Sequence, residues 1–297
     1  MQRETTTAGA AFAIATCALW ALSFVSPIVL VAFSPYAVTL GRYAVFGLVS
    51  LGMLFVSVRE VRALSIEDWI KAAWLAFVGH LAYYFFVATG IQLSDVAGPS
   101  VIIGLLPVTV PILANLRQRE LPWHALALPL LGILAGLFLI NADQYRAMSA
   151  AGSETRYGLG IASALAALAC WTWYGVANAA WLKARPSITA KAWTIAQGVT
   201  LLPIVLAAAI SIAVFDIDQS VRYASAAEWR EFAVVSLVVG VGSTWLATLC
   251  WSLASRLLPT TLAGQFIVCT PIAAIAYESL YRQAILELTR FRGHFSM

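Results

Sequence analysis

The chain consists of long apolar stretches that are separated by short polar joints. Nine of these stretches are long enough to cross a bilayer as helices, since about 20 apolar residues span its hydrocarbon core. They cover approximately residues 9–32, 36–58, 70–91, 96–116, 122–141, 158–182, 189–214, 231–254 and 258–279. A helix pairs its backbone groups internally, as lipid requires, so the pattern predicts an all-α polytopic membrane protein.

Composition and charge agree with this fold class. The chain has 297 residues, of which 61% are hydrophobic and 11% are charged, whereas a soluble domain carries roughly 25% charged residues. A single soluble core is therefore excluded. The stretch 9–32 is of span length and lacks the small-residue cleavage motif of a signal peptide, so we interpret it as the first membrane helix.

The basic residues indicate an orientation for the chain. With the N-terminus in the cytoplasm, more Lys and Arg fall in cytoplasmic loops than in outer loops, which is the usual bias. The high isoelectric point of about 9.0 therefore reflects membrane orientation, and we expect no nucleic-acid partner.

A comparison of the chain with itself indicates an internal repeat. An offset of 151 residues aligns Trp20 with Trp171, Pro35 with Pro186, Gly47 with Gly198 and Leu51 with Leu202. An offset of 160 then aligns Trp69 with Trp229, Pro99 with Pro259, Gly104 with Gly264 and Pro111 with Pro271. These identities fall at matching places in matching helices, so the chain is predicted to contain two copies of one unit.

We expect residues 1–150 and residues 151–297 to form the two units, each with a five-helix plan. An odd number of helices inverts the second unit relative to the first, and such inverted repeats place a substrate site near the midplane, where the units meet. The second copy is incomplete, because the tail after Tyr281 is too short and too charged to span. The tenth helix is predicted to be truncated, altered or atypical.

Aromatic and small polar residues recur on helix faces inside the apolar stretches. Residues three, four and seven apart share a helical face, and the sixth and first stretches present such faces. The expected substrate-binding residues are Trp20, Ser23, His80, Tyr83, Tyr84, Ser100, Trp171, Tyr174, Asn178, Ser243, Thr244, Trp245 and Gln265. Any one of them could instead pack and hydrogen-bond within the bundle. Their recurrence in both halves favours a cavity for a small molecule.

Two ionisable side chains lie inside spans and have two interpretations each. His80 is either a hydrogen-bonded core residue or a ligand for substrate or proton. Arg42 either extends to the outer interface or holds a substrate carboxylate. The acidic residues all fall in loops or at span ends, so no membrane-embedded carboxylate can act as an ion relay.

We expect no cofactor and no metal site. The cysteines lack the spacing of a metal site or a disulfide set and are interpreted as small core residues; they are Cys17, Cys170, Cys250 and Cys269. The chain also contains no phosphate-binding loop of the type GxxxxGK[ST], which argues against ATP hydrolysis.

Taken together, these features resemble the drug/metabolite transporter superfamily, and most of all its bacterial exporters of aromatic amino acids and metabolites. The resemblance rests on the two repeats, on Trp and small polar residues in the first and sixth helices, and on the charged joints after the fourth and ninth helices, Pro111 to Glu120 and Pro271 to Glu278. It covers roughly residues 9–280 and departs at the tenth helix.

The resemblance implies a multi-pass protein of the bacterial inner membrane, a monomer or weak oligomer, that exports small amphipathic molecules through a cavity between the repeats. A cavity with aromatic walls and the polar residues Ser23, His80, Asn178 and Gln265 would suit an amino acid. We therefore predict export of aromatic and other apolar amino acids by alternating access, down the substrate gradient. We expect no enzyme activity. A cationic-drug exporter is the alternative, although a cation site usually needs a carboxylate. An intramembrane hydrolase that pairs His80 with Ser243 is a weaker alternative. A nucleotide-sugar carrier is a further alternative, but it would need basic residues in the cavity to bind the diphosphate, and the expected cavity faces carry none.

Overall fold

The computed structural model describes residues 2–94, 99, 102–119, 154–274, 276, 277, 279 and 280, together with a few positions between 122 and 135. Three expectations lie outside the described residues. They are the placement of Ser100, most of the fifth expected span at 122–141, and the tail after Tyr281.

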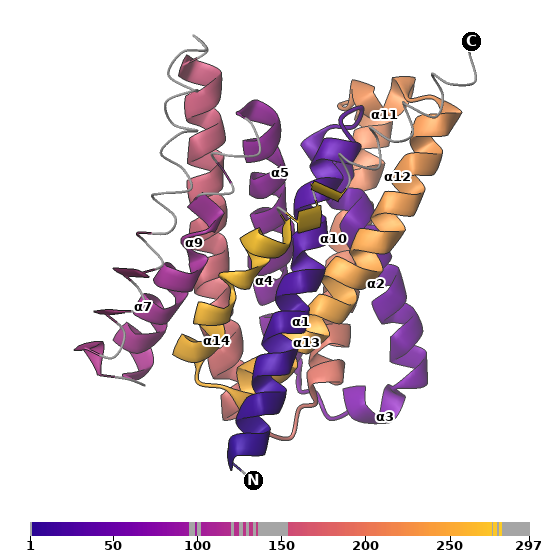
Figure 1. Cartoon of the computed structure of the whole chain (residues 1–297). Coiled ribbons are helices and arrows are strands. Elements are labelled where there is room, and N and C mark those ends of the chain that lie inside the picture. The colour runs from indigo at the N-terminus through magenta and orange to yellow at the C-terminus, as the bar shows by residue number, and fades with distance from the viewer. Residues whose placement is uncertain are drawn as a thin grey trace, which may run out of the picture.

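The described residues form a bundle of helices whose long members run from one end to the other (Figure 1). Six helices within them are long and apolar enough to cross a membrane, which confirms an all-helical polytopic protein. The elements are α1 (Gln2–Val29), α2 (Pro35–Val56), α3 (Val58–Val61), α4 (Ile66–Ala76), η1 (Phe77–Ala82), α5 (Tyr83–Leu93), α7 (Leu106–Gln118), α9 (Glu154–Ala184), α10 (Ala190–Phe215), α11 (Gln219–Tyr223), α12 (Ala226–Val238), η2 (Val239–Leu246), α13 (Ala247–Leu257) and α14 (Thr260–Phe266).

The third and eighth spans begin earlier than their apolar stretches predict, because each starts with the same kind of N-terminal cap. Ser65 caps α4 and Ser225 caps α12, each accepting a hydrogen bond from the backbone of the third helical residue. That third residue, Asp68 or Glu228, bonds back to the backbone of its cap, which completes a capping box. The caps are 160 residues apart, the offset that the self-comparison of the chain predicts.

Both of these spans also change from an α-helix to a wider π-helix in mid-course. The wide turns are η1, which follows α4, and η2, which follows α12. Such turns are uncommon and are often found at functional sites. Here η1 contains His80 and η2 contains Ser243 and Thr244, so the irregular backbone coincides with the expected site.

The most extensive helix contacts each join an element of residues 1–150 to an element of residues 151–297. The pairs are α2 with α10, α5 with α9, α1 with α13, and α7 with α14. The two halves are therefore interleaved. The division into two five-helix units of opposite orientation remains a prediction.

Helices α2 and α10 approach each other closely at two glycines. A Cβ on Gly47 would lie 2.8 Å from the Leu202 side chain, and a Cβ on Gly198 would overlap Ser50 and lie 3.1 Å from the Phe46 carbonyl oxygen. Small residues of this kind let membrane helices come close enough for backbone packing. The opposite face of α10 is apolar and exposed, as in Leu206 and Ile210, and so faces lipid.

The glycine contact predicts a stability defect with a matched rescue. Gly198→Ala should destabilise the protein by about 1–3 kcal/mol, because its methyl group overpacks against Ser50. Ser50→Gly in the same chain should restore part of that loss. Thermal unfolding of the purified protein in detergent measures both. The control is Gly52→Ala on α2, where a Cβ meets nothing within 4 Å; equal effects of the two alanines would contradict the packing role.

Candidate functional site

The side-chain amide of Gln197 lies at the centre of a buried hydrogen-bond network. Its Oε1 accepts from Nε2 of His80 at 2.8 Å and from the Tyr174 hydroxyl at 3.2 Å. Its Nε2 donates to Oδ1 of Asn178 at 3.4 Å, and that oxygen also accepts from Nε1 of Trp193 at 2.7 Å. Since a carbonyl oxygen can only accept, His80 donates through Nε2. The network joins η1, α9 and α10.

The wide turn η1 brings His80 and α9 together. Gly79 has no side chain where the Tyr174 ring packs against it, and a Cβ there would overlap that ring. The His80 ring then lies 5.1 Å from the Tyr174 ring and 5.6 Å from the Phe46 ring, centroid to centroid. His80 is 7% exposed and makes contacts on several sides.

A cluster of aromatic rings lies next to this network. Trp20 of α1 meets Trp171 of α9 edge to face at 5.1 Å, and Trp251 of α13 lies 5.4 Å and 5.1 Å from them respectively. Trp171 also contacts Tyr174 at 5.9 Å and Tyr83 of α5 at 6.5 Å. The cluster thus presents apolar and π surface from four helices beside the polar network.

A second polar group joins α1, α2, α5 and η2. The Tyr84 hydroxyl is 2.7 Å from the Ser26 hydroxyl and donates to the Ser23 carbonyl oxygen at 3.2 Å. Arg42 donates to Thr244 and Ser243 of η2, and its guanidinium stacks over the Tyr84 ring at 4.2 Å. Arg42 is 5% exposed, so it does not extend to the interface.

Several buried polar atoms at this centre have no hydrogen-bond partner among the described residues. They are Nη1 of Arg42, Nδ2 of Asn178, Nε1 of Trp245 and Nε1 of Trp251. Buried polar groups in proteins nearly always have partners; other buried side chains among the described residues, such as Ser50, Ser57 and Ser236, also lack one. The four N–H groups give the centre the capacity to donate hydrogen bonds to a bound molecule.

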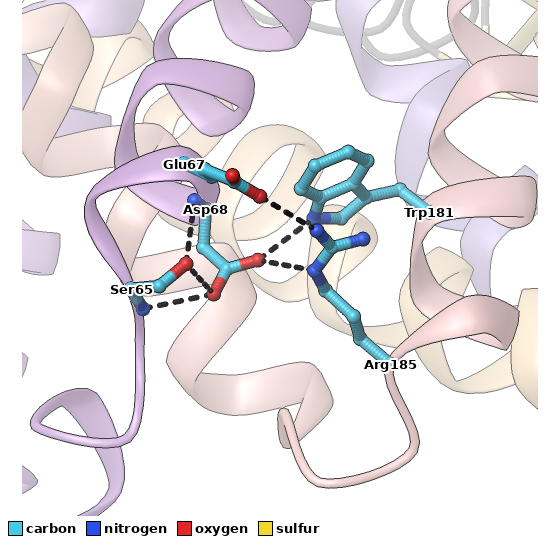
Figure 2. Close-up of polar contacts among 5 residues, drawn as sticks. All are labelled: Ser65, Glu67, Asp68, Trp181 and Arg185. Atoms are coloured by element: carbon cyan, nitrogen blue, oxygen red, sulfur yellow. Dashed lines mark hydrogen bonds and ion pairs between the residues drawn. The ribbon is translucent and has the colours of Figure 1, made fainter.

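A network of charged and polar groups joins the start of α4 to the end of α9 (Figure 2). Asp68, 4% exposed, accepts from Nε of Arg185 at 2.8 Å and from Nε1 of Trp181 at 3.2 Å. Its other oxygen accepts from the backbone and hydroxyl of Ser65. Arg185 also contacts Glu67 at 3.2 Å and stacks over the Trp181 ring at 3.5 Å. We call Ser65, Glu67, Asp68, Trp181 and Arg185 the Asp68 latch.

A second ion pair supports the same end of the bundle. Glu60 of α3 pairs with Lys191 and accepts a hydrogen bond from the Thr189 hydroxyl at 2.8 Å. These two interactions hold the pKa of the Glu60 carboxyl below its ordinary value, and the hydrogen bond with Lys191 has the larger effect. The segment between α2 and α4 is therefore tied to the segment between α9 and α10.

At the other end of the bundle, hydroxyl groups surround one carboxylate. Asp218 accepts hydrogen bonds from Ser34 and from the backbone and hydroxyl of Ser220, while the Ser34 backbone donates to the Ser220 hydroxyl at 2.9 Å. The Phe33 ring packs on Trp229 at 5.2 Å and on Phe232 at 4.6 Å. We call Ser34, Asp218 and Ser220 the Asp218 latch. It ties the α1–α2 segment to the segment that precedes α12.

Comparisons with known proteins identify the family. Residues 7–142 match the model of the EamA-like transporter family. The inner membrane protein YtfF of Escherichia coli strain K12 is 32% identical over 291 residues, which cover 96% of this chain and 91% of YtfF. The chain belongs to the EamA-like transporter family. It is thus a multi-pass membrane transporter of small molecules within the drug/metabolite transporter superfamily.

A solved structure, described only as the crystal structure of a protein, shares the fold of this EamA-like transporter. It superposes with a TM-score of 0.64 at 15% identity, over 92% of this chain and 88% of its own.

Most of the residues that the sequence singles out in this EamA-like transporter do lie together. The Gln197 network and the aromatic cluster contain Trp20, His80, Tyr83, Trp171, Tyr174 and Asn178. The second polar group contains Ser23, Tyr84, Ser243 and Thr244, which contact one another or Arg42. Trp245 is buried on the same element η2 as Ser243 and Thr244. Gln265, half-buried on α14, forms no side-chain hydrogen bond with these residues in the described part of the chain. Whether any of them binds substrate remains a prediction.

Sequence reasoning missed three residues of this centre. Gln197 is the only amide in the span 189–214, and that amide was the available signal. Trp193 and Trp251 gave no such signal, because a tryptophan at either position is equally well explained as a residue of the membrane–water interface. His80 and Ser243, which an intramembrane hydrolase would pair, instead bond to Gln197 and Arg42 respectively.

The network predicts a strong energetic coupling between His80 and Gln197. Gln197→Leu strands the buried donors of His80 and Tyr174, so it should cost about 1–3 kcal/mol for each stranded group. Adding His80→Leu should recover stability, because it removes one of these donors. A double-mutant cycle of unfolding free energies in detergent measures the coupling. His124→Leu, at an exposed histidine, is the control, and additive single effects would contradict the bond.

Proposed function

We propose that this EamA-like transporter exports amino acids, aromatic and other apolar ones among them, or related small amphipathic metabolites. Transport proceeds by alternating access through the centre of the bundle and down the substrate gradient. The observation that carries the proposal is the junction of aromatic rings and unpaired polar donors around Trp171, Asn178 and Arg42. Rings suit an apolar side chain, and fixed polar groups orient the charged part of an amino acid.

Alternating access is supported by the two latches. Each joins segments that belong to different halves of the chain, and they lie at opposite ends of the bundle, near α3 and near α11 (Figure 1). In the proposed cycle, both latches formed together would correspond to a state that is closed at each end. Opening one latch at a time would expose the centre to one side and then to the other.

An inverted repeat is part of the proposal. Trp20 and Trp171, which the offset of 151 residues aligns, contact each other, as residues near a two-fold axis would. The offset-related glycines Gly47 and Gly198 meet at the α2–α10 crossing. The bias of Lys and Arg in the loops favours an N-terminus in the cytoplasm. In that orientation the Asp68 latch would be the cytoplasmic closure and the Asp218 latch the outer one.

Export of cationic drugs is the alternative from the same class. Aromatic rings favour cations, and this centre is rich in rings. However, Arg42 brings a positive charge into the same region, and like charges repel strongly where little water is present. We therefore favour substrates that carry a negative group.

The aromatic cluster predicts a transport defect. In proteoliposomes, Trp171→Ala should lower uptake of labelled Phe, Trp and Leu about tenfold, because it removes several ring contacts. Trp171→Phe keeps a ring and should retain more activity. Protein in the membrane is quantified for each variant.

Trp74→Ala is the matched control, because Trp74 is 53% exposed on α4. Unchanged flux in Trp171→Ala at equal protein level would argue against the cluster as the substrate path. If the wild-type protein moves none of these amino acids, export of amino acids is wrong.

The Asp68 latch predicts that locking one end stops transport. In a chain whose cysteines Cys17, Cys170, Cys250 and Cys269 are replaced, Glu67→Cys with Arg185→Cys places two thiols across the latch. A short bifunctional thiosulfonate reagent should reduce flux to background, and dithiothreitol should restore it. Each single cysteine variant treated in the same way is the control. Full flux through cross-linked protein would show that this end does not need to open.

A further inference from the structure

Arg42 has an unusual position for a charged residue. It lies seven residues after the start of α2, about 10 Å along the helix axis, and is 5% exposed. A charge at such a depth is costly in a membrane protein and commonly marks a functional site. The other charged groups described above belong to the two latches or their supports at the ends of the bundle.

The partners of Arg42 are neutral. Nε donates to the Thr244 hydroxyl at 2.7 Å, and Nη2 donates to the Ser243 carbonyl oxygen at 3.2 Å. The guanidinium lies 4.2 Å from the centre of the Tyr84 ring. Among the described residues no carboxylate forms an ion pair with Arg42. Its charge is therefore solvated by dipoles and a π face but is not neutralised.

One edge of the guanidinium has no protein partner. Nη1 of Arg42 is buried and makes no hydrogen bond with any described residue. The remaining contacts fix the group, because Tyr84 is itself held by Ser26 and by the Ser23 carbonyl oxygen. The guanidinium is thus oriented in advance, with donor capacity left on one side. A purely structural link between α2 and η2 would need neither the charge nor the unpaired nitrogen.

We propose that Arg42 binds the carboxylate group of the transported molecule. A guanidinium matches a carboxylate in shape and charge, and bound carboxylate would satisfy Nη1 and neutralise the buried charge. This inference rests on the proposed function and narrows it: substrates carry a carboxylate, and amines or amides of the same shape are poor ligands. The aromatic cluster then accommodates the apolar part of the same molecule.

The backbone near Arg42 connects this site to helix movement. Both of its hydrogen-bonded partners belong to the wide turn η2, and a Cβ on Gly240 of that turn would lie 2.9 Å from the Arg42 carbonyl oxygen. A carboxylate that attracts the guanidinium competes with Thr244 and Ser243 for its donors. Substrate binding would therefore act on the contact between α2 and η2.

The test compares ligands that differ in one group. Phenylalanine and 3-phenylpropionate carry the carboxylate, whereas phenylalaninamide and 2-phenylethylamine lack it. Binding to the purified full chain in detergent is measured by tryptophan fluorescence, and uptake of the same compounds is measured in proteoliposomes. The variants are Arg42→Gln and Arg42→Lys, with Arg62→Gln at an exposed arginine as control.

We expect the wild-type protein and the control to bind both carboxylates and to discriminate against the amide and the amine. Arg42→Gln should weaken carboxylate binding about 10- to 100-fold, as expected for loss of a charged hydrogen bond, and should leave amide binding unchanged. Arg42→Lys should retain part of the preference, because it keeps the charge but loses the planar geometry.

Several outcomes separate this inference from the proposed function. Amino-acid uptake that persists unchanged in Arg42→Gln overturns the role of Arg42 and leaves export intact. Carboxylate binding that depends on Arg42, without uptake of any amino acid, supports the site and contradicts amino-acid export. If Arg42→Gln does not fold, the wild-type ligand series decides, and equal binding of phenylalanine and its amide overturns the inference.

Discussion

The centre of the bundle depends on the scarcity of water inside a membrane, which obliges each buried polar group to find a partner within the protein. Gln197 meets this requirement for three helices with one amide, since its oxygen serves His80 and Tyr174 and its nitrogen serves Asn178. Neither an apolar residue nor a charged one could accept and donate in this way without leaving a partner stranded. The relative positions of η1, α9 and α10 follow from that amide.

The ends of the bundle are held by a different kind of interaction, because charged side chains can be paired there. The Asp68 latch surrounds a buried carboxylate with a guanidinium, an indole and a serine, whereas the Asp218 latch uses serine donors and aromatic packing. Breaking a buried charged pair costs more than breaking hydroxyl bonds. If the proposed alternating access operates, this difference would favour opening at the Asp218 end first.

Six of the nine expected spans are found among the described residues, and these could be predicted from hydropathy because lipid imposes both their length and their composition. Their starts could not, since Ser65 and Ser225 extend α4 and α12 by capping outside the apolar stretches. Helical spacing and repeat matching found Trp20, Trp171 and Tyr174, which the structure brings together. The same method failed for Gln197, because its match at the offset of 151 residues is the apolar Phe46. The wide turns were not expected from the sequence. At η1 the Tyr174 ring packs onto Gly79, a contact between distant residues that local periodicity does not encode.

The wide turns η1 and η2 also have a consequence for how such a protein can diversify. A π-turn accommodates an extra residue within a helix, and one residue corresponds to about 100° of rotation in an α-helix of 3.6 residues per turn. Loss or gain of one codon near His80 or Ser243 would thus turn the second half of the span, α5 or α13, about its axis relative to the capped first half. The lining of the centre would change in a single evolutionary step, with the capping boxes and latches left intact.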